Sequence, residues 1–251
     1  MTTTRHIGHL ERIGLIGDVH AEHELLAQAL DFLSDAARTG GPLDAILCTG
    51  DIADGSGCVD QACDLLREYR VHTVAGNHDR WLLNDQVRHV EDAHQLDDIG
   101  NSSREFLNGL PQTLTFDSPM GPGMLCHGIG NKDLAKVWPG TERLEPERNA
   151  ALDAMIAEER YRLVLNGHMH FRCVIHFEGL ALLNAGTLKP RHKPGFSIVD
   201  FHTGAVSAHE FDGAECPAAM QRSLLPAPHD RVWANTQAFD GQWQPTTLYA
   251  Q

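Results

Sequence analysis

The chain has few basic residues, no closely spaced cysteine pair and no long apolar run. Its 251 residues include 20 lysines and arginines against 34 aspartates and glutamates, a net charge of −14 with neutral histidines. This balance disfavours binding to DNA, RNA or an anionic membrane surface, each of which selects a basic face. We therefore expect neither a long nucleic acid nor a membrane among its partners.

The cysteines and the apolar segments exclude further classes of protein. No two of the six cysteines form a Cys-x-x-Cys pair, so neither a zinc ribbon nor a thioredoxin-like redox centre is expected. No run approaches the roughly eighteen apolar residues of a membrane-spanning helix. The first apolar cluster, Ile13–Ile16, is too short for a signal sequence. Reduced, buried thiols and a cytoplasmic location fit these observations.

The first half of the chain alternates between two kinds of segment. Apolar runs at 13–16, 45–49 and 71–75 predict buried strands, and helical spacing over 25–37 and 60–69 predicts the helices between them. This alternation is typical of an α/β sheet with right-handed crossovers.

The second half is richer in strands. Strand-like segments occur at 113–116, 123–126, 163–166, 173–177, 180–184, 196–201 and 205–211, with helices expected over 102–108 and 146–160. This half predicts a second sheet packed on the first. The pattern breaks down from residue 214, so we expect a domain over 1–213 and a C-terminal extension over 214–251. That extension could wrap around the domain, join two copies as a homo-oligomer or be partly disordered.

The sequence contains sixteen histidines, which is an unusually high number, and several of them stand where strands are expected to end. The five polar fragments are Asp18-Val-His20, Gly50-Asp51-Ile-Ala-Asp54, Gly76-Asn77-His78-Asp79, Cys126-His127-Gly128 and Gly167-His168-Met-His170. Loops at the carboxyl ends of strands converge on one crevice in an open α/β sheet. Each fragment alone is more typical of a turn or a surface histidine, but the five in this order predict one metal centre. Oxygen and nitrogen donors without cysteine suit Mn²⁺, Fe, Zn²⁺ or Ni²⁺.

These fragments resemble the motifs of the calcineurin-like metallophosphoesterases. The similarity extends over residues 13–211, and the small YfcE-type phosphodiesterases are the most similar group, because Asn184-Ala-Gly-Thr187 follows the last fragment by a short hairpin. The resemblance implies a four-layered α/β/β/α sandwich of two mixed β-sheets flanked by helices. It also implies hydrolysis of a phosphoester by in-line attack of a hydroxide that bridges two metal ions.

The resemblance implies a role for each metal-binding or catalytic residue of the fragments. Two divalent ions (Mn²⁺, Fe²⁺/Fe³⁺, Zn²⁺ or Ni²⁺) are implied, the first held by Asp18, His20 and His170, the second by Asn77, His127 and His168, and both by Asp51. His78 would stabilise the transition state or protonate the leaving oxygen, and Asp54 would orient His78.

The motifs identify the substrate less clearly than they identify the metal ligands. Protein phosphatases and symmetrical diadenosine-tetraphosphate hydrolases carry an arginine where Gly55 follows Asp54 here. We therefore favour a small phosphodiester or nucleotide-type substrate. The alternatives are a phosphomonoesterase or protein phosphatase, a dinucleoside polyphosphate hydrolase, and a non-catalytic binding scaffold, which would be expected to have lost His78.

Three cationic residues are candidates for gripping the substrate. Arg80 adjoins the third fragment and Lys132 follows the fourth. Arg191 lies in the densest basic patch of the chain, Lys189–Lys193. A positive patch in so acidic a chain could also be an ordinary solvated loop.

Overall fold

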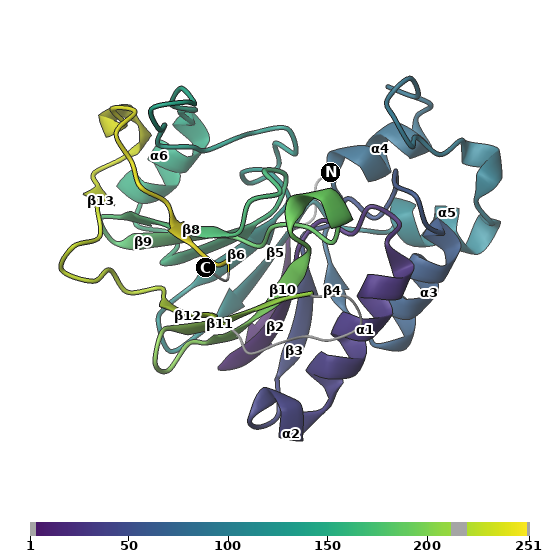
Figure 1. The fold of residues 1–251 in the computed structure, drawn as a ribbon, viewed down its shortest axis with the longest axis horizontal. Coiled ribbons are helices and arrows are strands. Elements are labelled where there is room, and N and C mark those ends of the chain that lie inside the picture. The colour runs from purple at the N-terminus through teal and green to yellow at the C-terminus, as the bar shows by residue number, and fades with distance from the viewer. Residues whose placement is uncertain (1–3, 212–219, 250–251) are drawn as a thin grey trace.

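The computed structural model describes residues 4–211 and 220–249, and within them the strands form two mixed sheets that pack face to face (Figure 1). Residues 212–219, at the start of the expected C-terminal extension, lie outside the described part. None of the described helices is long and apolar enough to cross a bilayer.

The six-stranded sheet carries the strands expected in the first half of the chain. Within the described residues its order is β12-β11-β10-β2-β3-β4. The strands are β2 (Arg12–Ile16), β3 (Ala45–Cys48), β4 (His72–Thr73), β10 (Gly195–Asp200), β11 (Ala205–Glu210) and β12 (Met220–Ser223). Strands β2, β3 and β4 are parallel, whereas β10, β11 and β12 pair antiparallel. The last two strands expected from the second half therefore join the first sheet and not the second.

The eight-stranded sheet contains the remaining strands of the described residues. Its order is β1-β5-β6-β7-β9-β8-β13, with β14 also paired to β8. The strands are β1 (Arg5–His9), β5 (Thr113–Asp117), β6 (Gly123–Cys126), β7 (Leu163–Asn166), β8 (Cys173–Phe177), β9 (Leu180–Asn184), β13 (Val232–Trp233) and β14 (Thr246–Thr247). The edge strand β1 was not expected, because its polar residues form no apolar run.

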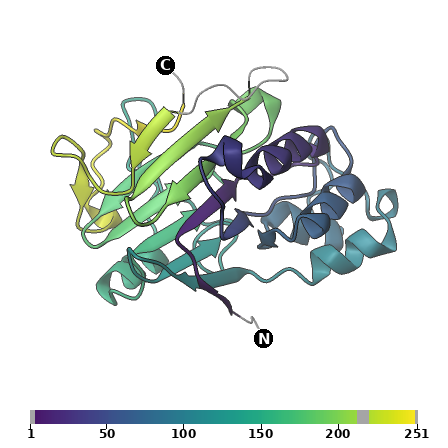
Figure 2. The same ribbon diagram turned by 90° about the horizontal axis from the view of Figure 1, so that it is seen from below.

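Helices cover the outer faces of both sheets (Figures 1 and 2). They are α1 (His23–Ser34), α2 (Ala36–Thr39), α3 (Val59–Glu68), α4 (Asn77–Leu83), α5 (Asn101–Asn108) and α6 (Ala150–Ala157). Helix α6 begins four residues later than expected, because the Asn149 side chain accepts hydrogen bonds from the amides of Ala151 and Leu152 and so caps the helix there.

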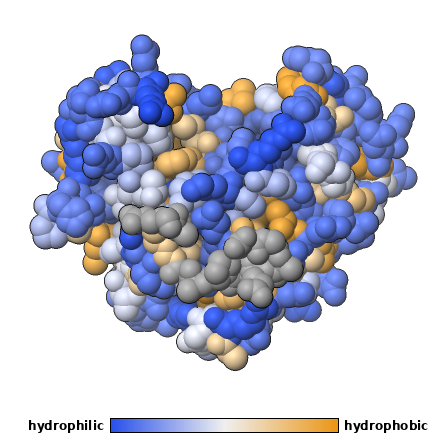
Figure 3. Space-filling view, viewed as in Figure 1, coloured by the Kyte–Doolittle hydropathy of each residue, from blue (hydrophilic) through white to orange (hydrophobic). Residues whose placement is uncertain are grey.

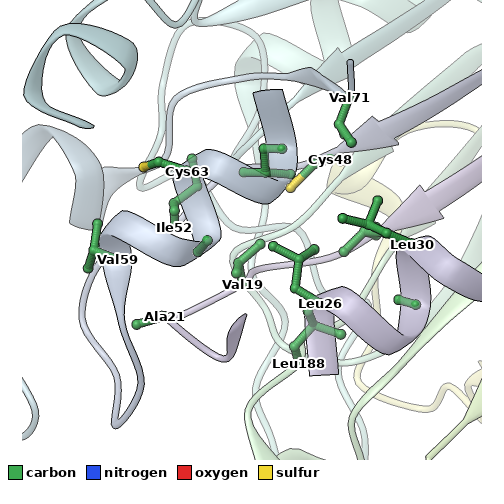
Figure 4. Packing of buried hydrophobic residues seen from close by; sticks show 14 of the residues in the cluster. Val19, Ala21, Leu26, Leu30, Cys48, Ile52, Val59, Cys63, Val71 and Leu188 are labelled. Atoms are coloured by element: carbon green, nitrogen blue, oxygen red, sulfur yellow. The ribbon is translucent and has the colours of Figure 1, made fainter. Parts of the chain in front are cut away.

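Three apolar clusters separate four layers. The first joins α1 and α3 to the six-stranded sheet, and Figure 4 shows Leu26 and Leu30 of α1 beside Cys48 of β3. The second lies between the two sheets and includes Leu15 and Leu165. The third packs α6 on the outer face of the eight-stranded sheet. Full burial of each such leucine stabilises the folded state by about 1.5–3 kcal/mol. The predicted α/β/β/α sandwich is therefore confirmed.

The described part of the C-terminal extension packs on both sheets. Strand β12 pairs with β11, whereas β13 and β14 flank β8. Trp233 and Trp243 belong to the third apolar cluster, where the Trp243 ring lies 5.2 Å from the ring of Trp138. Residues 220–249 therefore contribute to the core.

Candidate metal centre

The predicted fragments meet at one edge of the sandwich. Asp18, Asp51 and Asn77 follow β2, β3 and β4 of one sheet, whereas His127 and His168 follow β6 and β7 of the other. Strands β2, β3 and β4 are parallel to one another, and so are β6 and β7, so the carboxyl ends of the strands within each set lie at the same edge of their sheet. Above it the surface is hollowed between the two shoulders that carry α6 and α4 (Figures 1 and 3).

The first group of candidate ligands consists of Asp18, His20, Asp51 and His170. One donor atom of each lies within 4.8 Å of the others. The Nε2 atoms of His20 and His170 are 2.9 Å apart, and Asp18 Oδ2 lies 3.3 Å from His170 Nε2. These donors surround a space suited to a single cation.

The second group consists of Asp51, His127 and His168, again within 4.8 Å. Asp51 Oδ2 lies 3.2 Å from His127 Nε2, and Asn77 Oδ1 lies 3.0 Å from the same nitrogen. Asp51 belongs to both groups, which is the position that a bridging carboxylate needs.

Several of these residues have an unusual backbone conformation. Positive φ angles occur at His20 (48°), Asp51 (46°), Asp54 (67°), His168 (66°) and His170 (54°). A non-glycine residue in this region costs of order 1–3 kcal/mol, and such residues cluster at functional sites. The surrounding fold therefore imposes these positions on side chains that local propensity would place elsewhere.

The segment after β9 holds Asp18 in place. The Asp18 amide donates to Gly186 O at 3.1 Å, and the Thr187 hydroxyl donates to Asp18 O at 2.8 Å. The Thr49 hydroxyl donates to Asp18 Oδ1 at 2.8 Å. Gly17 permits this approach, since a Cβ there would lie 2.1 Å from Gly186 O. The Asn184–Thr187 segment noted in the sequence thus positions a candidate ligand.

Backbone carbonyls orient two of the imidazoles. His20 Nδ1 lies 2.8 Å from Asp54 O, and His127 Nδ1 lies 2.8 Å from Thr49 O. A carbonyl oxygen can only accept, so each Nδ1 carries a proton, and the Nε2 atom of each ring faces the cluster and can bind a metal when the ring is neutral. His168 Nε2 is buried and has no hydrogen-bond partner among the described residues. A metal ion would satisfy such an atom.

Three of the histidines are held neutral. Burial lowers the pKa of His20 and of His168 to about 4, and that of His170 to about 2. Neutral imidazole is the form that binds metals.

The carboxylates and His127 form a buried charge cluster. Burial would lower the pKa of His127, but Asp51 and Asp18 outweigh it and raise that pKa to about 10. Burial raises the pKa of Asp18 to about 7, whereas His127 overrides the effect of burial at Asp51 and holds its pKa below the usual range. The ion-pair partners of both carboxylates are histidines among the described residues. The donors therefore fit divalent cations, which would supply the missing positive charge.

A second group of polar residues borders the cluster. His78 Nδ1 donates to Asp54 Oδ2 at 2.7 Å. Burial would lower the pKa of His78, but its hydrogen bond to Asp54 and the nearby carboxylates raise that pKa above the usual value. Arg88 donates to both carboxylate oxygens of Asp54 at 2.8 and 2.9 Å. Arg88 could not be predicted from the sequence, because it lies in an irregular polar segment with no fixed spacing to the motifs.

Asp79 ties the third fragment to the second. Its Oδ1 accepts from the amides of Ile52 and Ala53 at 2.8 and 3.0 Å, and its Oδ2 accepts from Gly76 N at 2.9 Å. The buried carboxylate thereby places the start of α4, and with it Asn77, against the loop after β3.

The three candidate substrate cations have different environments. Arg80 is paired with both carboxylate oxygens of Asp133, at 2.6 and 3.1 Å. Lys132 is exposed, and Arg191 is 85% exposed with its nearest carboxylate, Glu91, at 3.9 Å. No hydrogen bond within the described chain joins Lys132 or Arg191 to the candidate ligands. A contact that the motifs did not indicate is made by His192, whose Nδ1 lies 2.9 Å from His170 Nδ1.

The model of the calcineurin-like phosphoesterase superfamily domain matches residues 12–204. The chain belongs to this superfamily, as the motifs predicted. No curated protein matches it.

Solved structures of low sequence identity share the fold. A metallophosphoesterase from Sphaerobacter thermophilus is 20% identical with a TM-score of 0.58, over 81% of this chain and 88% of that one. A hypothetical protein from Pyrococcus horikoshii is 15% identical with a TM-score of 0.62, over 82% and 88%. The phosphoesterase YfcE from E. coli is 13% identical with a TM-score of 0.50, over 85% and 100%.

Proposed function

We propose that the chain hydrolyses a small phosphodiester or nucleotide-type substrate with the help of two divalent metal ions. The pairing of His78 with Asp54 at 2.7 Å, beside the candidate ligands, carries this proposal. The His78 ring lies 4.9 Å from the ring of His20. A binding scaffold has no use for a proton donor at this place, whereas phosphoester hydrolysis requires one.

Different residues would perform different steps of such a reaction. Asp18, His20 and His170 would hold one cation, Asn77, His127 and His168 the other, and Asp51 both. Two bound cations supply a nucleophilic water at neutral pH and neutralise charge on the phosphoryl oxygens. Asp54 fixes the ring of His78, and the hydrogen bond to Asp54 favours the protonated ring, which can donate to the leaving oxygen.

The pairing of the arginine side chains near the site supports a diester substrate over a monoester. A monoester dianion brings one more negative charge than a diester and gains more from free cationic side chains. Arg80 and Arg88 are each engaged by both oxygens of a carboxylate. An arginine cannot occupy position 55, because a Cβ there would lie 1.7 Å from His20 O.

A metal-screened assay tests the preference. Bis-p-nitrophenyl phosphate, p-nitrophenyl phosphate, cyclic nucleotides and dinucleoside polyphosphates should be compared with Mn²⁺, Fe²⁺, Zn²⁺ and Ni²⁺. We expect hydrolysis of the diester in preference to the monoester. Hydrolysis of monoesters alone would overturn the phosphodiesterase assignment.

Substitution of His78 tests the mechanism. Because general acid catalysis contributes about 10²–10⁴-fold, His78→Ala should lower kcat by at least about a hundredfold. Metal content should stay near two ions per chain, since His78 is not among the candidate ligands. His89→Ala, on an exposed residue, is the matched control. Unchanged kcat in His78→Ala would contradict the proposed role.

A further inference from the structure

A pocket of about 540 Å³ opens beside the candidate metal ligands and has no part in the chemistry described so far. It is lined by Met169, His170, Phe171, His192, Lys193, Thr247 and Tyr249. Its volume lies within the roughly 300–1,000 Å³ typical of small-molecule sites. His170 belongs both to this lining and to the first ligand group, so a molecule in the pocket adjoins the metal centre.

The walls of the pocket are aromatic, with a cation nearby. The rings of Phe171 and Tyr249 meet edge to face at 5.2 Å. Lys193 Nζ lies 5.3 Å from the centre of the Tyr249 ring. Met169 adds a polarisable thioether, which makes favourable contacts with aromatic rings. This surface suits a flat aromatic group better than a sugar or a second phosphate.

Hydrogen bonds hold these walls in place. The Tyr249 hydroxyl accepts from Arg172 N at 2.8 Å, and Leu248 N donates to Arg172 O at 3.0 Å. The guanidinium of Arg172 is fully buried, lies 4.9 Å from the Tyr249 ring centre and donates to Lys193 O at 3.3 Å. Arg172 thus joins the C-terminal wall to the turn that carries Lys193. A pocket built in this way needs little rearrangement on binding.

The C-terminal wall lies outside the region that matches the superfamily. Thr247 and Tyr249 come from β14 and the residues after it, beyond the 12–204 region that matches the superfamily. Thr247 is placed by its antiparallel pairing with Cys173 of β8. Figure 1 shows this end of the described chain in front of the eight-stranded sheet.

We propose that this pocket binds a nucleobase whose nucleoside is esterified to the phosphate at the metal centre. This inference rests on the proposed phosphoesterase function and names its substrate class, a nucleoside phosphodiester. Stacking on aromatic side chains accepts any base, because every base has a π-face. The metal centre selects the phosphate, whereas the C-terminal wall selects what is attached to it.

Binding without catalysis gives the first test. Saturation-transfer NMR on the zinc-loaded full chain should detect adenosine and not ribose. Thr247→Trp fills the pocket and Phe171→Ala removes one wall, so both should weaken adenosine binding about tenfold or more. Phe106→Ala, on a half-buried phenylalanine of α5 outside the pocket, should leave it unchanged. Failure of adenosine to bind, or equal binding in Thr247→Trp, overturns the inference.

Catalysis gives the second test. Hydrolysis of adenosine 5′-ethyl phosphate and of diethyl phosphate can be followed by phosphorus NMR. In the wild type, kcat/KM for the adenosine ester should be more than about ten times that for diethyl phosphate. This ratio should fall about tenfold in Thr247→Trp and stay unchanged in Phe106→Ala. An unchanged ratio in Thr247→Trp overturns the inference. If adenosine binds in the pocket but neither ester is hydrolysed under any metal, the pocket stands and the proposed phosphodiesterase function fails.

Discussion

Arg88 holds Asp54 with both terminal nitrogens of its guanidinium, Nη1 at 2.8 Å from Oδ1 and Nη2 at 2.9 Å from Oδ2. The side chain of Arg88 is only 10% exposed. A bidentate pair fixes the plane of the carboxylate as well as its position. The plane of Asp54 in turn sets the ring of His78, so an arginine outside the motifs controls the orientation of the candidate proton donor.

Loss of Arg88 should therefore impair turnover. We expect Arg88→Gln to lower kcat for bis-p-nitrophenyl phosphate by about 10–100-fold, because a small misplacement of a catalytic group has a large effect. KM and metal content should change little. Arg88→Lys should recover only part of the activity, since an ammonium group cannot form the same fork. Arg67→Gln, which removes a surface pair with Asp64, is the control, and an equal loss there would refute the prediction.

Metal ions should stabilise the fold, because the candidate ligands include buried carboxylates that lack lysine or arginine partners in the described chain. A cation at about 100 times its Kd adds about 2.7 kcal/mol to the free energy of unfolding. His168→Ala removes a ligand of the second group and should lower metal content from two ions toward one. The Tm gain on adding Mn²⁺ should shrink in parallel. Calorimetry and elemental analysis measure both, with the exposed His202→Ala as control; full occupancy in His168→Ala would exclude this ligand.

Gly17 should tolerate no side chain. A Cβ would lie 2.1 Å from Gly186 O, the oxygen that accepts the Asp18 amide. We expect Gly17→Ala to lower the free energy of unfolding by about 1–3 kcal/mol through overpacking, and to weaken metal binding by displacing Asp18. In the control Gly100→Ala the nearest atom to the new Cβ is 3.5 Å away. Urea unfolding and metal titration should separate the two variants, and equal stability would show that the contact relaxes without cost.

His176 should make stability fall at acidic pH. Burial in β8 lowers the pKa of His176, although Asp230 opposes the shift. As the pH falls below about 6.5, the unfolded chain binds a proton that the native ring does not. The contribution of neutral His176 to stability is thus present above that pH and is lost as the pH falls toward the lowered pKa. Urea unfolding at about pH 7.5 and about pH 5.5 should show a smaller decrease for His176→Gln than for the wild type or for His202→Gln. Identical decreases would be inconsistent with this account.

Elements with a strong apolar pattern could be predicted from the sequence. The runs at 13–16, 45–49 and 163–166 became β2, β3 and β7, because a buried strand needs nearly continuous apolar residues. Strand β1 could not be predicted, since it lies at an edge and is held by backbone hydrogen bonds to β5. The same holds for β14, which pairs with β8 over Thr246 and Thr247.

The order of the five polar fragments along the chain identified the superfamily, and each candidate ligand lies within four residues of the end of a strand, where the sequence analysis expected the fragments to converge. The amino-acid sequence by itself therefore determined the family, the layers of the sandwich and the Asp and His residues that the fold gathers into two groups able to hold a metal. It contained no local signal for Arg88, which meets Asp54 across 34 positions of the chain, or for Tyr249, whose hydroxyl meets Arg172 across 77. Only the tertiary structure decided these contacts, because periodicity reports which face of an element is buried and not which distant side chain lies against it.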